Sequence, residues 1–206
     1  MKVLALGGSG GMGRFSSFAI SNYPNITKVT IADLNEDNAK EFSNLFDDRF
    51  TGIGLDVTGK EHLEKVMSGH DIVLNTTGPF FKFGLPILKS AIKCKCHYFD
   101  ICDDWEPTEE MLKLNDEALK NEITAIVGLG ASPGISNLLG LKAMNELDKT
   151  ESIITGWDVS SAKPEDESSQ KGTNAAMEHG LQQISGEIKV YKDKKYKLTK
   201  PLEKIK

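Results

Sequence analysis

Short apolar runs alternate with amphipathic stretches along roughly the first 130 residues, and this alternation constrains the fold most strongly. Nearly continuous apolar runs of this length are typical of strands buried on both faces. The expected strands are Lys2–Leu6, Val29–Ala32, Phe50–Leu55, Asp71–Asn75, His97–Ile101 and Ile123–Val127. The expected helices between them are Met12–Asn22, Glu36–Phe46, Lys60–Met67, Leu85–Ile92 and Thr108–Asn121. This order predicts the α/β class, with a doubly wound parallel sheet covered on both sides.

The composition changes after Leu147, so we expect a domain of residues 1–147 and a partial, smaller α+β domain of residues 148–206. Roughly 50 residues bury little surface on their own, so the second part is expected to be the opening of a larger domain. Its expected elements, after a helix Ile135–Asn145, are a strand Ile153–Ser160, a helix Thr173–Ile184 and a hairpin of Glu187–Tyr191 with Tyr196–Leu198.

Charge and cysteine content exclude several classes of protein. The net charge of −5 gives no overall basic field for nucleic acid, and the eight lysines of the last twenty residues fit solvated strand faces better than a nucleic-acid tail. No apolar run approaches the roughly 20 residues of a membrane span, and glycines interrupt the first strand too early for a signal peptide. Cys94, Cys96 and Cys102 lack the spacing of a metal site, so we expect free thiols, no metal and a cytoplasmic protein.

A glycine-rich loop follows the first expected strand and opens a helix. Gly8-Ser9-Gly10-Gly11-Met12-Gly13 fits the G-x-G-x-x-G pattern, in which the first glycine makes a tight turn and the second lets the backbone approach a pyrophosphate. The third glycine allows close packing of helix and strand, and the helix N-terminus attracts negative charge. The pattern predicts a Rossmann domain.

The acid that ends the second expected strand bears on the cofactor. Asp33 lies 20 residues past Gly13, where a carboxylate accepts hydrogen bonds from the adenosine ribose and repels a 2′-phosphate. Leu34 and Asn35, which follow it, offer no arginine for that phosphate. The sequence therefore predicts that NAD is favoured over NADP.

Two further strand ends are predicted to contact the cofactor. The loop that begins at Asn75 follows the fourth strand beside the first, and Asp56-Val57 follows the third, although this pair could instead begin a helix. The complete predicted cofactor site is Gly8, Ser9, Gly10, Gly11, Met12, Gly13, Asp33, Leu34, Asp56, Val57, Asn75, Thr76, Thr77, Gly78 and Pro79.

Three acids, Asp100, Asp103 and Asp104, lie at the end of the fifth strand and just after it, at the same sheet edge. Paired carboxylates can share a proton or bind an ammonium group, and they can equally cap the helix near Thr108. We take Asp100 and Asp103 as the candidate catalytic residues; strand alternation sends His97 to the other face from Asp100.

The glycine loop, Asn75–Phe80, His97–Asp100 and Gly128–Asn137 together resemble the saccharopine dehydrogenase-like family, which includes carboxynorspermidine dehydrogenases. The stretch Met177–Tyr191 is similar to this family's second domain. The resemblance implies an oxidoreductase that transfers hydride at a carbon–nitrogen bond of an amino acid or polyamine derivative, and a homodimer joined through the second domain.

Two other interpretations need comparison with this one. The chain stops before such a substrate domain would be finished, so the alternative is a dinucleotide-binding module without catalysis, acting as a sensor or partner subunit. A short-chain dehydrogenase needs Tyr-x-x-x-Lys on a helix, and the matches Tyr191–Lys195 and Tyr196–Lys200 fall in expected hairpin sequence, so we reject it.

Overall fold

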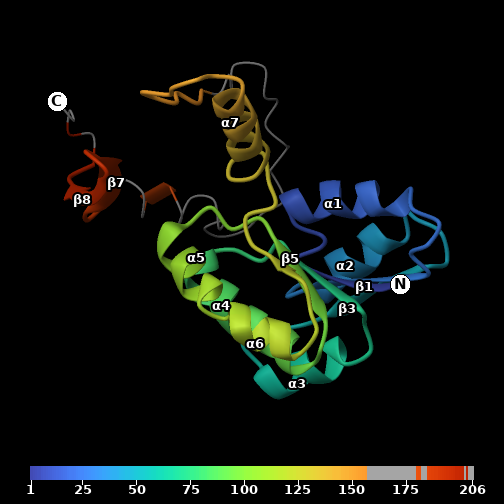
Figure 1. Cartoon of the computed structure of the whole chain (residues 1–206). Coiled ribbons are helices and arrows are strands. Elements are labelled where there is room, and N and C mark those ends of the chain that lie inside the picture. The colour runs from blue at the N-terminus through green and yellow to red at the C-terminus, as the bar shows by residue number, and fades with distance from the viewer. Residues whose placement is uncertain (157–179, 182–184, 202, 204–206) are drawn as a thin grey trace. The chain divides into compact units, whose positions relative to one another are not determined.

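The computed structural model of the chain describes residues 1–156, 180–181, 185–201 and 203 (Figure 1). The chain divides into two compact units, Met1–Lys163 and Pro164–Lys206. The predicted domain boundary at Leu147 stays a prediction, because residues 157–179 around this division lie outside the described part. Among the described residues, no helix has the length and apolar character needed to cross a membrane.

Within the described part of the first unit, six strands form one parallel sheet in the order β3-β2-β1-β4-β5-β6. The strands are β1 (Lys2–Leu6), β2 (Lys28–Asp33), β3 (Phe50–Gly54), β4 (Ile72–Asn75), β5 (His97–Asp100) and β6 (Ala125–Ile126). The chain proceeds outward from β1 to β3 and then returns to place β4 on the other side of β1. This is the predicted doubly wound α/β fold, and the reversal of strand order lies between β1 and β4.

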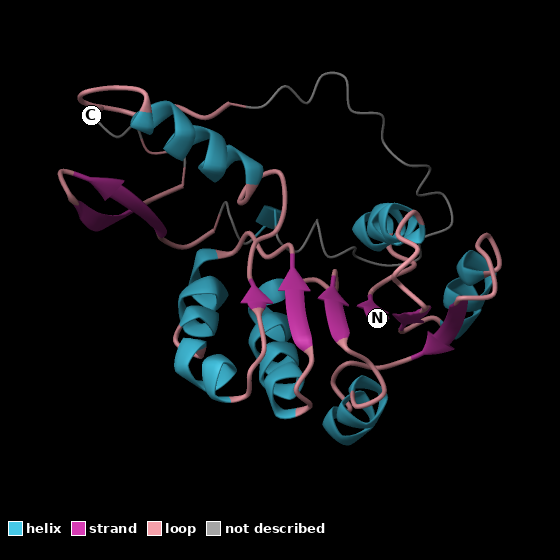
Figure 2. Cartoon of the chain, turned by 45° about the vertical axis from the view of Figure 1, so that its right-hand side comes forward, coloured by secondary structure: helices cyan, strands magenta, loops and turns pink. Residues whose placement is uncertain are grey.

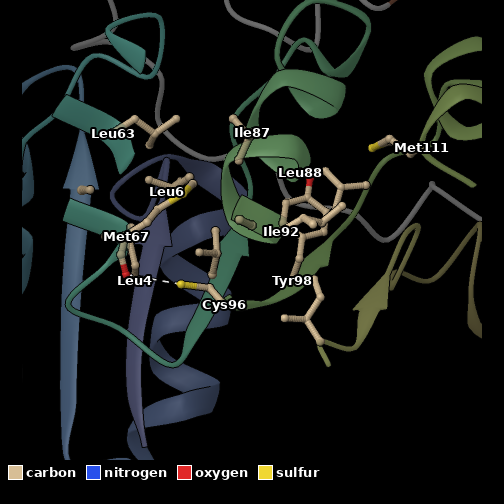
Figure 3. Close-up of a cluster of buried hydrophobic side chains, with 14 of the residues drawn as sticks. Leu4, Leu6, Leu63, Met67, Ile87, Leu88, Ile92, Cys96, Tyr98 and Met111 are labelled. Carbon is tan, nitrogen blue, oxygen red and sulfur yellow. Dashed lines mark hydrogen bonds between the residues drawn. The ribbon is translucent and has the colours of Figure 1, made fainter. Parts of the chain in front are cut away.

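Helices cover both sides of the sheet (Figure 2). They are α1 (Gly11–Ser21), α2 (Glu36–Ser43), α3 (Lys60–Met67), α4 (Phe80–Lys93), α5 (Trp105–Leu112) and α6 (Asn115–Lys120). Successive residues of β1 face opposite sides: Val3 belongs to a buried cluster with Phe42 of α2, and Leu4 to another with Leu63 of α3 and Ile87 of α4. Figure 3 shows part of the cluster that contains Leu4, where α3 and α4 pack over β1 and β5.

Two predicted helices differ from the observed ones. The helix expected from Leu85 begins at Phe80, directly after Pro79, so that Pro86 lies inside α4 rather than in its first turn. The buried residues Phe80, Gly84 and Ile87 recur at helical spacing, and their burial outweighs the hydrogen bond that Pro86 removes. The helix expected over 108–121 is two helices, α5 and α6.

Helix α1 packs through small side chains rather than through its phenylalanines. Gly13 and Ser17 are its buried residues, while Phe15 is 63% exposed. Phe18 is 49% exposed, yet its ring meets that of Phe42 at 5.6 Å between centroids. The sequence pattern predicts that Phe15, Phe18, Ala19 and Asn22 form the buried face of this helix. Both phenylalanines lie largely outside the core, because the close approach of α1 to the sheet leaves room only for small residues.

The chain beyond the sheet contains a helix and a hairpin. Helix α7 (Ile135–Asn145) has the predicted bounds, and none of its described residues is buried. The predicted hairpin is confirmed as β7 (Ile188–Lys192) paired antiparallel with β8 (Lys195–Thr199). Residues 153–156 are irregular; the rest of the strand expected at Ile153–Ser160, and nearly all of the helix expected at Thr173–Ile184, lie outside the described residues.

Arg49 cross-links two turns at the amino edge of the sheet. Its guanidinium donates to the carbonyl of Ser21, the last residue of α1, at 2.8 Å, and to those of Ile26 at 3.0 Å and Tyr23 at 3.2 Å in the α1–β2 connection. It also pairs with Asp47 in the α2–β3 connection at 2.7 Å. The two connections are thereby held together at the edge opposite the strand ends that carry the predicted site.

Candidate dinucleotide-binding site

The carboxyl ends of the central strands lie in one row. Leu6 of β1 is in register with Asn75 of β4, and Asn75 with Asp100 of β5. The amide of Thr76 continues the ladder by donating to the Leu6 carbonyl at 2.9 Å. The loops after β1, β4 and β5 therefore leave the sheet side by side at the reversal of strand order, where open α/β sheets bind their ligands.

The glycine loop joins the end of β1 to α1. The first hydrogen bond of α1 runs from the amide of Arg14 to the Gly10 carbonyl at 2.9 Å, so the amides of Gly11, Met12 and Gly13 precede the helical ladder. The N-cap residue, Gly10, has no side chain to cap them. Unpaired amides at the positive end of a helix dipole favour an anion.

Gly7, Gly10 and Gly13 of this loop differ in how far their surroundings restrict a side chain. Gly7, which the sequence pattern did not single out, has φ +67°, a conformation that other residues rarely adopt. A Cβ on Gly13 would lie 2.1 Å from the Gly7 carbonyl oxygen, so only glycine fits there. Gly10 has φ −75° and ψ 173°, which any residue adopts, and its Cβ would have as its nearest neighbour the Gly7 oxygen at 3.2 Å. A side chain at Gly10 would therefore make one close contact with the backbone, whereas at Gly13 it would overlap the Gly7 oxygen.

The predicted ribose-binding acid is held by the chain itself. Asp33 accepts a hydrogen bond from the Ser9 hydroxyl at 2.7 Å and a long one from the Asn35 amide at 3.4 Å. These contacts tie the glycine loop to the end of β2. The neighbouring Leu34 is 77% exposed.

The loop after β4 completes the centre of the site. The Thr76 hydroxyl donates to the Leu6 and Gly7 carbonyls at 2.9 and 3.1 Å, so this loop and the glycine loop are in direct contact. The hydroxyl oxygen of Thr77 is buried and has no hydrogen-bond partner among the described residues. Such an atom fits a site whose polar partner is a ligand. Gly78 and Pro79 then lead into α4.

The predicted residues after β3 are more peripheral. Asp56 accepts hydrogen bonds from the amide and hydroxyl of Thr58 at 2.8 and 2.7 Å, and these bonds lower the pKa of the Asp56 carboxyl. Val57 lines a cavity of about 450 Å³ between α3 and α4. Asp56 thus orders the turn before α3, and cofactor contact at both residues stays a prediction.

The two candidate catalytic acids have opposite environments. Asp100 is fully buried: Oδ2 accepts from the Tyr98 hydroxyl at 2.7 Å, and Oδ1 from the amides of Gly128 at 2.8 Å and Cys102 at 3.0 Å. Burial raises the pKa of the Asp100 carboxyl, while these hydrogen bonds act in the opposite direction. Asp103 is exposed. The structure therefore brings Asp100 to the sheet edge but places it under the surface, and leaves Asp103 accessible.

The remaining polar residues near this edge act locally. Asp104 is the N-cap residue of α5, as the capping alternative expected, but its side chain makes no cap hydrogen bond. Burial raises the pKa of Cys102 to about 12, which keeps it a thiol. His97, the first residue of β5, lies at the opposite, amino edge of the sheet, where it accepts from the Thr124 amide at 2.9 Å, on the other face of β5 from Tyr98.

A doubly wound parallel sheet with a glycine-rich, uncapped helix start at its reversal point defines a dinucleotide-binding Rossmann domain. Residues 3–126 match the family described as saccharopine dehydrogenase NADP binding domain, and the chain belongs to that family.

Individual relatives agree with this assignment. The chain is 27% identical over 129 residues to the saccharopine dehydrogenase (NADP(+), L-glutamate-forming) of Schizosaccharomyces pombe, covering 63% of this chain and 27% of the relative. It is 30% identical over 97 residues to that of Saccharomyces cerevisiae, covering 47% and 21%. The solved apo saccharopine dehydrogenase (L-Glu forming) from S. cerevisiae superposes with a TM-score of 0.61 and 28% identity, covering 70% of this chain and 31% of that one. The chain thus spans about a quarter of the length of these curated relatives.

The predicted preference for NAD is wrong. The matched family is an NADP-binding domain, and the relatives are NADP(+) enzymes. The prediction treated the Asp33 carboxylate as free to accept from a ribose and to repel a phosphate. In the structure this carboxylate accepts hydrogen bonds from Ser9 and Asn35, so an acid at the end of β2 is accounted for by the folding of the loop and does not by itself select the cofactor.

Proposed function

We propose that this chain is the NADP(H)-binding part of a saccharopine dehydrogenase-like oxidoreductase that acts at a carbon–nitrogen bond of an amino acid or polyamine derivative. What carries the proposal is the loop Gly7–Gly13: its helix start is uncapped, and a glycine at the N-cap, Gly10, lets the backbone approach a pyrophosphate. The fit of this loop to a pyrophosphate and the family membership support the same class of ligand.

Each residue of the site would bind or orient the cofactor or the substrate. The amides of Gly11–Gly13 would hold the pyrophosphate, and glycine at position 10 would let it approach the backbone. The bound dinucleotide would also supply a hydrogen-bond partner for the buried hydroxyl of Thr77. NADP(H) supplies or accepts the hydride at its nicotinamide ring. Asp103, which is exposed at the same sheet edge, is the candidate for binding or deprotonating the substrate amine.

Substitution of Gly10 tests the binding site directly. Gly10→Val should abolish measurable NADPH binding while the domain stays folded, because the backbone at Gly10 is extended and the new side chain would fill the ligand's space. Gly69→Val is the matched control: its Cβ would make only an ordinary contact, 3.6 Å from the Val66 carbonyl oxygen. Titration followed by nucleotide fluorescence measures NADPH binding, and circular dichroism measures whether the domain is folded. Normal NADPH binding by Gly10→Val would show that the loop is only a turn.

The second candidate function is a dinucleotide-binding module without catalysis. It is favoured by the complete burial of Asp100, one of the two candidate catalytic acids, which leaves its carboxylate no exposed surface. Oxidation of NADPH by the chain in the presence of imines derived from lysine or polyamines separates the two: turnover supports the oxidoreductase, and tight binding with no turnover supports the module. A cytoplasmic location and a homodimer remain part of the proposal.

A further inference from the structure

A buried hydrogen-bonded chain connects two loops of the site that are far apart in sequence. The Thr77 amide donates to Asn75 Oδ1 at 3.0 Å, and Asn75 Nδ2 donates to the Tyr98 hydroxyl at 3.0 Å. The Tyr98 hydroxyl donates to Asp100 Oδ2 at 2.7 Å, and the Gly128 amide donates to Asp100 Oδ1 at 2.8 Å. The loop after β4 is thereby linked through β5 to the loop that begins at Gly128.

We propose that Tyr98 and Asp100 are positioning residues that hold the loop Asn75–Pro79 and the loop Gly128–Gly134 in one fixed relation, so that both meet the bound dinucleotide as a single unit. This inference rests on the proposed function, since it concerns the same site.

Burial and polarity support the assignment. The side chains of Asn75, Tyr98 and Asp100 are all 0% exposed, and Tyr98 packs in the apolar cluster beneath α4 beside Ile92 (Figure 3). Buried polar groups are costly unless every donor and acceptor is paired, whereas an apolar side chain would fill the same space without that requirement. A chain in which every buried side-chain polar atom has a partner, and which ends in two site loops, therefore fixes loop geometry in a way that apolar packing would not.

The direction of the bonds explains why Asp100 acts through the loops. Three donors converge on its carboxylate, and its backbone carbonyl accepts a fourth bond, from the Leu129 amide at 2.7 Å. With no exposed surface, this carboxylate cannot touch a substrate in the described conformation. Its contact with the site passes through Gly128 and Leu129 on one side and through Tyr98 and Asn75 on the other.

Tyr98→Phe tests the link by removing one hydroxyl. In the 206-residue protein, amide exchange of Thr77 and of Gly128–Gly130 should become faster together, by about tenfold, as expected for loss of one buried hydrogen bond. NADPH affinity should fall by about tenfold for the same reason. Exchange of the β2 and α2 amides should not change. Tyr23→Phe is the control, because Tyr23 is 58% exposed and lies at the amino edge.

Asp100→Asn provides a second variant of nearly the same size, in case the first does not fold. It can keep an acceptor oxygen for Gly128 but places an amide where Tyr98 donates, so both loops should again loosen. Unchanged exchange in the two loops, faster exchange in only one of them, or unchanged NADPH affinity would overturn the link. Failure of the wild-type chain to bind NADPH would instead refute the proposed function, and the exchange measurement would still decide whether the loops are coupled.

Discussion

Gly13 and Gly10 differ in what makes each of them a glycine. A Cβ on Gly13 would meet the backbone of the neighbouring turn, with the Gly7 oxygen at 2.1 Å and the Gly8 Cα at 2.7 Å. These are backbone atoms that cannot move aside without opening the loop. At Gly10 the nearest contact of a Cβ would be milder, 3.2 Å to the Gly7 oxygen, and glycine there lets the proposed ligand approach the backbone. One residue serves the fold and the other the ligand, although both occupy the same sequence motif.

Alanine at each position should separate these roles. Gly13→Ala should lower the free energy of unfolding by about 2 kcal/mol, since overpacking against backbone outweighs the helix propensity that alanine gains. Gly10→Ala should lower it by less, about 1 kcal/mol, the usual cost of alanine at an N-cap. Urea unfolding followed by circular dichroism measures both values. Equal stability of the two variants would contradict the close packing of α1 against the loop.

At the scale of elements, His70 joins the end of α3 to β2. Its Nδ1 lies 2.8 Å from the Val66 carbonyl and its Nε2 2.8 Å from the Thr30 hydroxyl, so the neutral ring donates to Val66 and accepts from Thr30. Burial lowers the pKa of His70; Lys28 and Lys2 also lower it, while the bond to Val66 and the charge of Asp71 act against this.

The lowered pKa gives a pH dependence with a defined sign. The folded protein favours neutral His70, so its contribution to stability is present above the unfolded pKa of about 6.5 and is lost as the pH falls through the folded pKa. The difference in free energy of unfolding between wild type and His70→Gln should therefore shrink between about pH 7.5 and about pH 5.5. Urea titrations at both pH values measure it; a difference that is constant or grows at the lower pH would refute this reading of His70.

Much of the element order could be predicted from sequence, because buried parallel strands and amphipathic helices have distinct periodicities. The strand end at Asn75, the glycine loop and the bounds of α7 followed from local pattern, and the fifth strand ends at Asp100, one residue before the predicted end. The break between α5 and α6 and the early start of α4 depend on packing that no local window contains. Tyr98 could not be identified as a link, since a tyrosine in an apolar strand looks like core until its hydroxyl is found to bond both Asn75 and Asp100.

For the whole molecule, the exposed aromatic residues of the hairpin bear on the expected homodimer. Tyr191 and Tyr196 are 66% and 64% exposed, and Leu198 is 59% exposed. A two-stranded hairpin also has two open edges and little core of its own. Both features are typical of a surface that is covered on association.

Removal of everything after Leu147 tests this expectation. We predict that the 206-residue chain is a homodimer through Ile153–Ser160 and Glu187–Leu198, and that residues 1–147 form a monomer that still binds NADPH, because they retain the glycine loop and Asn75–Pro79. Light scattering on both proteins measures the mass. A monomeric full chain, or a dimeric truncated one, would place the interface elsewhere.

The guanidinium of Arg49 has a consequence for how the family can vary in length. Its three carbonyl acceptors, Ser21, Tyr23 and Ile26, lie between the last residue of α1 and the start of β2. An insertion or deletion between them would therefore move at least one carbonyl beyond hydrogen-bonding distance of Arg49. Relatives with the same number of residues between α1 and β2 are expected to keep an arginine at this position. Those with a longer or shorter connection are expected to have lost it, and an alignment of the family would reveal the correlation.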